Sequence, residues 1–172
     1  KNLLQSSSSS QTAKIKSWLA EKQSAFAAAK SAIEVSGYDQ ATLQKVLDKY
    51  YGFDSDFQNG LYIATADGQY MKATDSTKTE KDPLNSEWYK HGITTINMSI
   101  TDPYEDSDGN KIISASGILN DGSGQIKVIG ADLSLNSITT IVNSSVSMDG
   151  AAAFLINNND DVASENNLPF GI

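Results

Sequence analysis

The sequence contains no cysteine among its 172 residues, and it has only three prolines and one histidine. Without thiols, the chain can form neither disulfide bonds nor zinc–thiolate sites, although this absence does not fix the compartment. The lone histidine, His91, has no cysteine to pair with and belongs to no recognisable Ser-His-Asp arrangement. We therefore expect neither an enzyme nor a bound cofactor or metal.

Positive charge and long apolar runs are also scarce. The chain carries 13 Lys and Arg against 21 Asp and Glu, which gives a net charge of −8. Such an acidic chain is a poor nucleic-acid binder and is repelled by anionic lipid head groups. No apolar run is long enough to span a bilayer. Because the chain begins at Lys1 rather than Met, we expect a piece of a longer protein, with any membrane segment outside it.

Apolar residues recur at helical spacing in the first 35 residues and predict one long helix. The apolar stripe comprises Ile15, Leu19, Phe26 and Ile33. The Ser6–Ser10 run is unfavourable inside a helix, so either the helix starts after it or a partner holds the first turns. Asp39 is placed to cap a second helix over residues 40–51.

The remaining pattern predicts about five antiparallel strands joined by tight turns. Asp67-Gly68 is a strong hairpin signal. The predicted strands span residues 61–66, 69–73, 93–101, 111–119 and 126–133, with a last strand at 151–156. Further helices are predicted at 84–91 and 135–146. Because no βαβ repetition occurs, we expect an α+β, PAS-like fold with helices on one face of the sheet.

Two adjacent aromatic residues, Trp88 and Tyr89, close the segment DPLNSEWY at residues 82–89. Aromatic side chains with polar tips suit the wall of a small-ligand pocket, but an ordinary loop anchor has the same composition. Small residues in the middle of strand 111–119 leave room above the sheet.

Three segments in order, DPLNSEWY, DPYED (102–106) and VIGADLSL (128–135), resemble the extracellular Cache sensor domain. More closely, the chain resembles the membrane-distal module of a double Cache domain from a bacterial methyl-accepting chemotaxis receptor, over nearly all of residues 1–148. The resemblance implies a membrane-connecting, dimerising helix (1–36) and a sensor module (37–148). Residues 149–172 would be a connector or the start of a second Cache module.

The resemblance also implies a ligand site above the sheet, under the segment that carries Trp88 and Tyr89. Tyr104 and Asp132 match two further positions of the amino-acid-binding branch. Asp132 would pair with a ligand ammonium, and the three aromatic residues would add cation–π contact. The alternative is that Asp132 caps the helix that starts at Leu135, a role that Ser134 suits equally well.

Two positions depart from that branch. Ser86 stands where the branch has an arginine that grips the ligand carboxylate, and Lys81 stands where it has a tyrosine. Serine cannot replace a guanidinium, and Lys81 can do so only as a point charge. These departures favour a cationic or neutral ligand, such as an amine, or no small ligand at all.

The resemblance predicts an extracytoplasmic, periplasmic sensing domain of a transmembrane receptor in the bacterial inner membrane. It would bind an amine or amino-acid-like molecule and form a homodimer through its first helix. The alternatives are the input domain of a membrane sensor histidine kinase or of a cyclic-dinucleotide enzyme, and an interaction module without a small-molecule ligand.

Overall fold

The computed structural model describes the backbone of residues 2–142 and the side chains of residues 11–140. The predicted strand at 151–156 and the segment 149–172 lie outside the described residues. Helix α1 (Asn2–Glu34) is one continuous helix that passes through the serine run, so the interpretation in which the helix starts after those serines is wrong. Across the described residues, no helix has both the length and the hydropathy that a membrane span needs.

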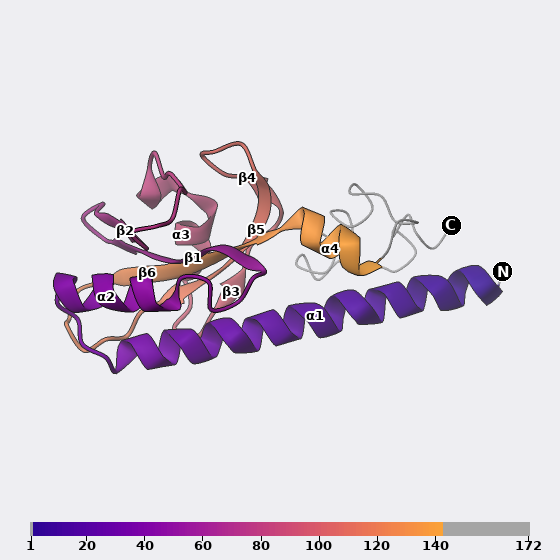
Figure 1. Ribbon diagram of the computed structural model, residues 1–172, viewed down its shortest axis with the longest axis horizontal. Coiled ribbons are helices and arrows are strands. Elements are labelled where there is room, and N and C mark those ends of the chain that lie inside the picture. The colour runs from indigo at the N-terminus through magenta and orange to yellow at the C-terminus, as the bar shows by residue number, and fades with distance from the viewer. Residues whose placement is uncertain (1, 143–172) are drawn as a thin grey trace.

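A second helix and a six-stranded antiparallel sheet follow α1 (Figure 1). The helix α2 (Gln40–Tyr50) is capped by Asp39, as predicted, and the Asp39 carboxylate accepts the N–H of Thr42 at 3.0 Å. The sheet order is β2-β1-β6-β5-β3, with β4 also paired to β5. The strands are β1 (Phe57–Thr65), β2 (Tyr70–Lys72), β3 (Ser99–Ile100), β4 (Tyr104–Glu105), β5 (Lys111–Ile118) and β6 (Lys127–Ser134).

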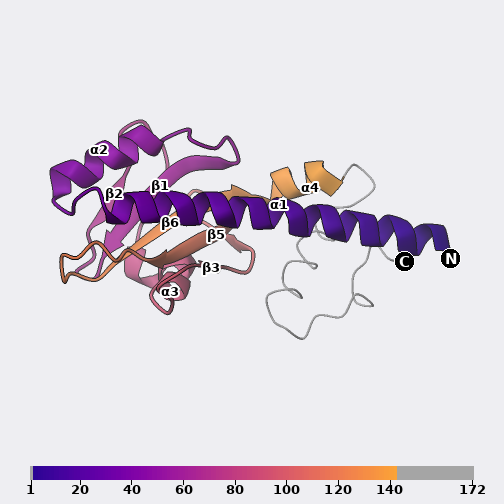
Figure 2. The same cartoon turned by 90° about the horizontal axis from the view of Figure 1, so that it is seen from below.

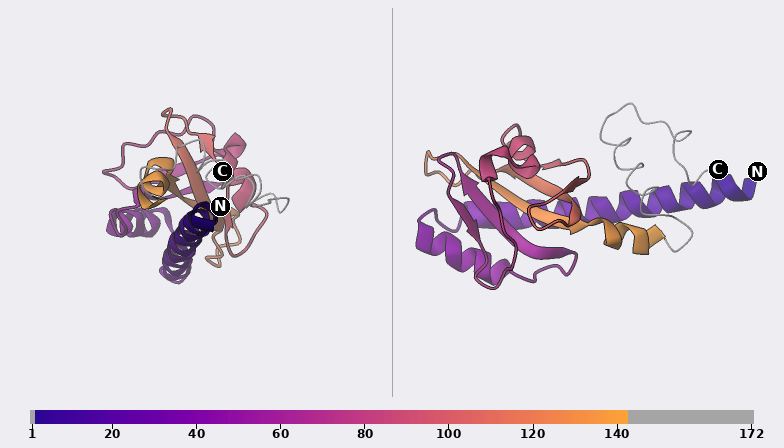
Figure 3. Two further views of the ribbon diagram at one scale, coloured as in Figure 1. Left: turned by 90° about the vertical axis from the view of Figure 1, so that its right-hand side faces the viewer. Right: turned by 90° about the horizontal axis from the view of Figure 1, so that it is seen from above.

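The two faces of the sheet carry different layers, since side chains alternate along each strand. One face packs under α1 and α2 with an apolar core from β1, β5 and β6 that includes Leu61, Ile113 and Leu133. Figures 2 and 3 show α1 running along this face and extending beyond the sheet. The last described helix, α4 (Leu135–Val142), packs against α1.

The opposite face carries the 3-10 turn η1 (Pro83–Asn85) and the short helix α3 (Glu87–Gly92). Here Tyr62, Trp88 and Val128 form a second, smaller core. Gly92 lies directly on the sheet, because a Cβ at this position would stand 2.5 Å from Val128 Cγ1. The expectation of helices on one face only is therefore wrong: α3 lies on the other face.

Two strand predictions also need correction. Strand β1 begins at Phe57, four residues before the predicted start, and its extra residues pair irregularly with β6. The predicted strand 93–101 is reduced to Ser99–Ile100, and Ile96 is 66% exposed. The turn that ends α3 uses the start of this segment, because Thr94 and Thr95 donate their N–H groups back to His91 and Gly92.

Candidate functional site

A buried carboxylate, Asp132, lies at the centre of the α3 face of the sheet. The residue belongs to β6, directly opposite Ser114 of β5, and it is 2% exposed. Its Oδ1 accepts hydrogen bonds from the hydroxyls of Tyr62 and of Ser114, the latter at 2.8 Å. Asn59 donates to Oδ2 at 3.4 Å. These contacts place Asp132 in a buried polar network, and α4 is capped instead by Ser134, whose hydroxyl accepts the N–H of Asn136.

The cation of this network is Lys78, which sequence reasoning missed. Its Nζ lies 2.7 Å from Asp132 Oδ2 and 3.6 Å from Asp106 Oδ2, and it lies over the ring of Tyr62. Burial by itself lowers the pKa of Lys78, but the charge of Asp132 and its hydrogen bond more than offset this and leave the pKa above its ordinary value. Lys78 is therefore charged, and it neutralises a carboxylate that burial would otherwise make very costly.

Tyr104 joins this network to the surface of the molecule. Its hydroxyl lies 2.7 Å from Ser114 Oγ. Because Ser114 gives its own proton to Asp132, the Tyr104 hydroxyl donates to Ser114. Burial and the nearby charge of Asp132 raise the pKa of Tyr104, so its proton stays in place at neutral pH. Of the predicted site residues, Tyr104 and Asp132 are thus brought together by the fold.

Trp88 and Tyr89 lie deeper than a pocket wall would require. Trp88 is fully buried, and its ring meets Tyr62 edge to face with 4.6 Å between the centroids. Its indole N–H donates to Glu80 Oε1 at 2.8 Å. Tyr89 is also buried, which raises the pKa of its hydroxyl. Both residues belong to the second, smaller core, and their contact with a ligand stays a prediction.

Ser86 and Lys81 lie at the edge of the site. Ser86 caps α3, with its hydroxyl accepting the N–H of Tyr89 at 3.3 Å. Lys81 is exposed, and its backbone N–H donates to Ser107 Oγ at 3.2 Å. Neither side chain reaches the Asp132 network through a hydrogen bond or ion pair in the described structure.

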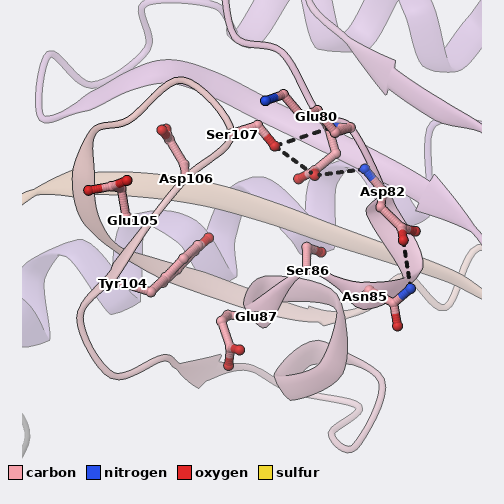
Figure 4. Close-up of a pocket in the computed structure, with 10 residues that line it drawn as sticks. Glu80, Asp82, Asn85, Ser86, Glu87, Tyr104, Glu105, Asp106 and Ser107 are labelled. Carbon is pink, nitrogen blue, oxygen red and sulfur yellow. Dashed lines mark hydrogen bonds between the residues drawn. The ribbon is translucent and has the colours of Figure 1, made fainter.

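A cavity of about 290 Å³ opens beside this network, between the segment 80–87 and the segment 104–107 (Figure 4). Tyr104 and Asp106 line the cavity and connect it to the buried network, because Tyr104 contacts Ser114 and Asp106 lies near Lys78. The lining contains five carboxylates and one lysine. The charged lining residues are Glu80, Asp82, Glu87, Glu105, Asp106 and Lys81. The cavity therefore favours a cationic guest.

Polar contacts join the two walls of the cavity to each other. The Ser107 hydroxyl donates to Glu80 at 3.3 Å, and Thr79 donates its N–H to Asp108 at 2.9 Å. With the Lys78–Asp106 pair, residues 78–81 are joined at each position to the turn 106–108. Within residues 2–142, no group of acidic or histidine side chains is arranged to hold a metal ion.

The model of methyl-accepting chemotaxis protein-like first PDC sensor domains matches residues 14–140. A relative at the sequence level is the methyl-accepting chemotaxis protein McpG of Pseudomonas putida. It is 33% identical over 98 residues, which make up 56% of this chain and 15% of McpG. The chain therefore spans only a small part of that receptor.

Solved ligand-binding domains of chemoreceptors share the fold. The ligand-binding domain of the Pseudomonas fluorescens chemoreceptor CtaA, in complex with L-isoleucine, superposes with a TM-score of 0.66 at 22% identity, covering 87% of this chain and 65% of that one. The domain of the Pseudomonas aeruginosa receptor PctC, in complex with GABA, gives a TM-score of 0.68 at 21% identity, covering 83% and 67%. The predicted resemblance is thus confirmed, and the chain belongs to the Cache/PDC family of methyl-accepting chemotaxis protein-like sensor domains.

Proposed function

We propose that the chain is the extracytoplasmic ligand-sensing module of a transmembrane chemotaxis receptor, and that it binds a small amine or amino-acid-like molecule. The observation that carries this proposal is the acidic cavity backed by Tyr104 and the buried Asp132. Its volume of about 290 Å³ lies near the lower end of the range of small-molecule sites, and its polar groups converge from two segments of the chain. Relatives with the same fold hold L-isoleucine and GABA, which are both amino compounds.

Signal transmission would use the helices of the other face. The β5 and β6 strands carry the site on one face and the core under α1 on the other. A ligand that shifts these strands would therefore change the packing of α1. A signal requires that the ligand bind two arrangements of the module with different affinity.

A homodimer through α1 belongs to the same proposal. The exposed side of α1 carries a row of small residues, which would allow two helices to approach closely. These residues are Ala13, Ser17, Ala20, Ser24, Ala27 and Ser31. The rest of the receptor, including its membrane attachment in the bacterial inner membrane, would lie in flanking segments.

The test is a binding screen of the 172-residue chain against primary amines, amino acids and short carboxylates. Thermal unfolding finds the compounds that bind, and calorimetry measures their affinity. We expect at least one amine or amino acid to raise the unfolding temperature in a saturable way. Tyr104→Ala should abolish this shift because it removes a cavity wall, whereas Tyr38→Ala, an exposed tyrosine outside the cavity, should keep it. A screen in which no compound binds would contradict the proposed function.

A further inference from the structure

Both oxygens of the Asp132 carboxylate already accept from two donors each within the chain. Tyr62 and Ser114 donate to one oxygen, and Lys78 and Asn59 donate to the other. Three of these four donors are neutral, and Lys78 alone brings a charge. A ligand ammonium can therefore reach Asp132 only where the Lys78 ammonium now lies.

Lys78 is held in this place by a short ion pair with Asp132, a longer one with Asp106 and the ring of Tyr62. Its ammonium has three N–H donors, and among the described residues it has one hydrogen-bond acceptor, Asp132 Oδ2 at 2.7 Å. Asp106 Oδ2, at 3.6 Å, is buried and has no hydrogen-bond donor in the described structure. A buried ammonium and a buried carboxylate oxygen thus face each other without a hydrogen bond, so the cation position is incompletely satisfied.

The backbone that carries Lys78 is irregular. The residues between β2 and η1 form no helix or strand, and polar contacts with the turn 106–108 hold them in place. A change in this stretch breaks no sheet ladder and no helix. Withdrawal of Lys78 is thus compatible with an intact fold.

The cavity beside Lys78 determines which guest could replace it. Asp106 belongs both to the cavity wall and to the ion cluster, and the lining is acidic. A carboxylate ligand would meet like charge there, whereas a primary amine would be attracted. The amine could then supply to Asp132 the same charged hydrogen bond that Lys78 makes.

We propose that Lys78 is the specificity-determining residue of the pocket: its ε-ammonium occupies the cation position at Asp132, and a primary amine that enters through the acidic cavity binds by displacing it. This inference rests on the proposed function, because it names the ligand class and the competitor of the same site. Only molecules in which Lys78 is withdrawn can bind the amine. The apparent Kd of the wild-type chain is therefore the intrinsic Kd divided by the fraction of such molecules.

The experiment compares Lys78→Ala with Lys78→Met in the 172-residue chain, with n-butylamine as the probe. The alanine variant removes the charge and opens the space, so butylamine should bind at least tenfold more tightly than to wild type and raise the unfolding temperature. The methionine variant removes the charge but fills the space, so it should gain nothing. Butyrate, of the same length and opposite charge, should bind neither variant.

A variant of the carboxylate itself shows where the amine binds. Asp132→Asn in the Lys78→Ala background should lose the gain, because the carboxylate that pairs with the cation at 2.7 Å is gone. If Lys78→Ala is unfolded in buffer, the measurement becomes the recovery of its circular dichroism in butylamine. Recovery supports the proposal, and its absence overturns it.

The two proposals fail in different ways. If wild type binds a ligand from the screen but Lys78→Ala gains no affinity for butylamine, the role of Lys78 is wrong and the sensing function stands. If Lys78→Ala binds butylamine while wild type binds no compound in the screen, the cation position at Asp132 is supported and the proposed sensing function is wrong. Equal gains in the alanine and methionine variants would also overturn the inference, because they would show that space at Asp132 is irrelevant.

Discussion

Gly130 of β6 lies against the ring of Tyr62 so closely that a Cβ at position 130 would stand 2.6 Å from Tyr62 Cε1. The same Cβ would be 3.1 Å from Trp88 Cε3. Both rings are fully buried in the core on the α3 face. The absence of a side chain at Gly130 therefore lets the two aromatic residues lie directly on the sheet, beside the Asp132 network.

The first prediction concerns this contact. Gly130→Ala should lower the free energy of unfolding by about 1–3 kcal/mol, because overpacking forces the buried rings to move. Urea unfolding measures the change. In a Tyr62→Leu background the added cost should be smaller, since the ring that the methyl group meets is gone. An equal cost in both backgrounds would show that the strain lies elsewhere.

The second prediction concerns the hydrogen bond between Glu80 and the indole of Trp88. Glu80→Ala should cost about 1.5–3 kcal/mol, the usual value for a hydrogen bond to a charged group, while Glu80→Gln keeps an acceptor and should cost less. Urea unfolding followed by tryptophan fluorescence measures both. Lys90→Ala is the control, because Lys90 is exposed and lies on α3, the helix that carries Trp88. It should change the free energy of unfolding by less than about 0.5 kcal/mol. Equal effects of alanine and glutamine at position 80 would argue against this bond.

The third prediction concerns the cap of α3. Ser86→Ala should destabilise the chain by about 1 kcal/mol because the N–H of Tyr89 loses its acceptor, whereas Ser86→Asn should keep most of the stability. Denaturant unfolding separates the two variants. Ser86→Arg, which introduces the arginine that the family resemblance led us to expect at this position, would carry the same capping cost. When that variant is screened with carboxylates, each unfolding temperature must therefore be compared with that of the same variant without ligand.

The fourth prediction concerns acid. Hydrogen bonds from Thr42, Thr74 and Thr79 hold the pKa values of Asp39, Asp48 and Asp108 below their ordinary value of 3.8. A carboxyl whose pKa is lower in the folded state stabilises the fold at higher pH and loses this effect as the pH falls through the folded pKa. The unfolding temperature should thus be steady above about pH 5 and decline below about pH 4. Asp108→Asn should show a shallower decline. A profile that is flat down to pH 2 would contradict the assignment.

The fifth prediction tests the dimer. Ala20→Arg with Ala27→Arg places two large charged side chains on the exposed row of α1, and arginine keeps nearly the helix propensity of alanine. Sedimentation equilibrium should show a weaker dimer than for wild type, with an unchanged circular dichroism spectrum. Lys14→Arg is the matched control, because it changes an exposed α1 residue without changing charge. A dimer of wild-type strength in the double variant would exclude this face.

Local signals account for the parts of the fold that the sequence predicts well. The Asp39 cap and the Asp67-Gly68 turn depend on residues close in the chain, and both are found as expected. The alternation of Ile96, Met98 and Ile100 was a weaker guide. It predicts a long strand, but the end of α3 takes up the residues before it and leaves Ile96 exposed.

The sequence predicts only part of the site, for a related reason. Tyr104 and Asp132 were found through segments that resemble a family, and the fold brings them into one network through Ser114. Lys78 lies in a charged, threonine-rich stretch, and this composition is typical of a solvated loop. Its burial depends on Asp132, a residue far along the chain in a different strand, so no local pattern could have singled it out.

The contact of Gly92 with the sheet has a mechanical consequence for the module. Because its backbone stands on Val128 and Ser116 without clearance, the end of α3 has no room to move toward the strands. Residues 78–81, by contrast, belong to no helix or strand, and polar contacts join them to the turn 106–108. The end of α3 is thus held by close packing of its backbone on the sheet, whereas the stretch that carries Lys78 is held by polar contacts and can shift without disturbing a helix or strand.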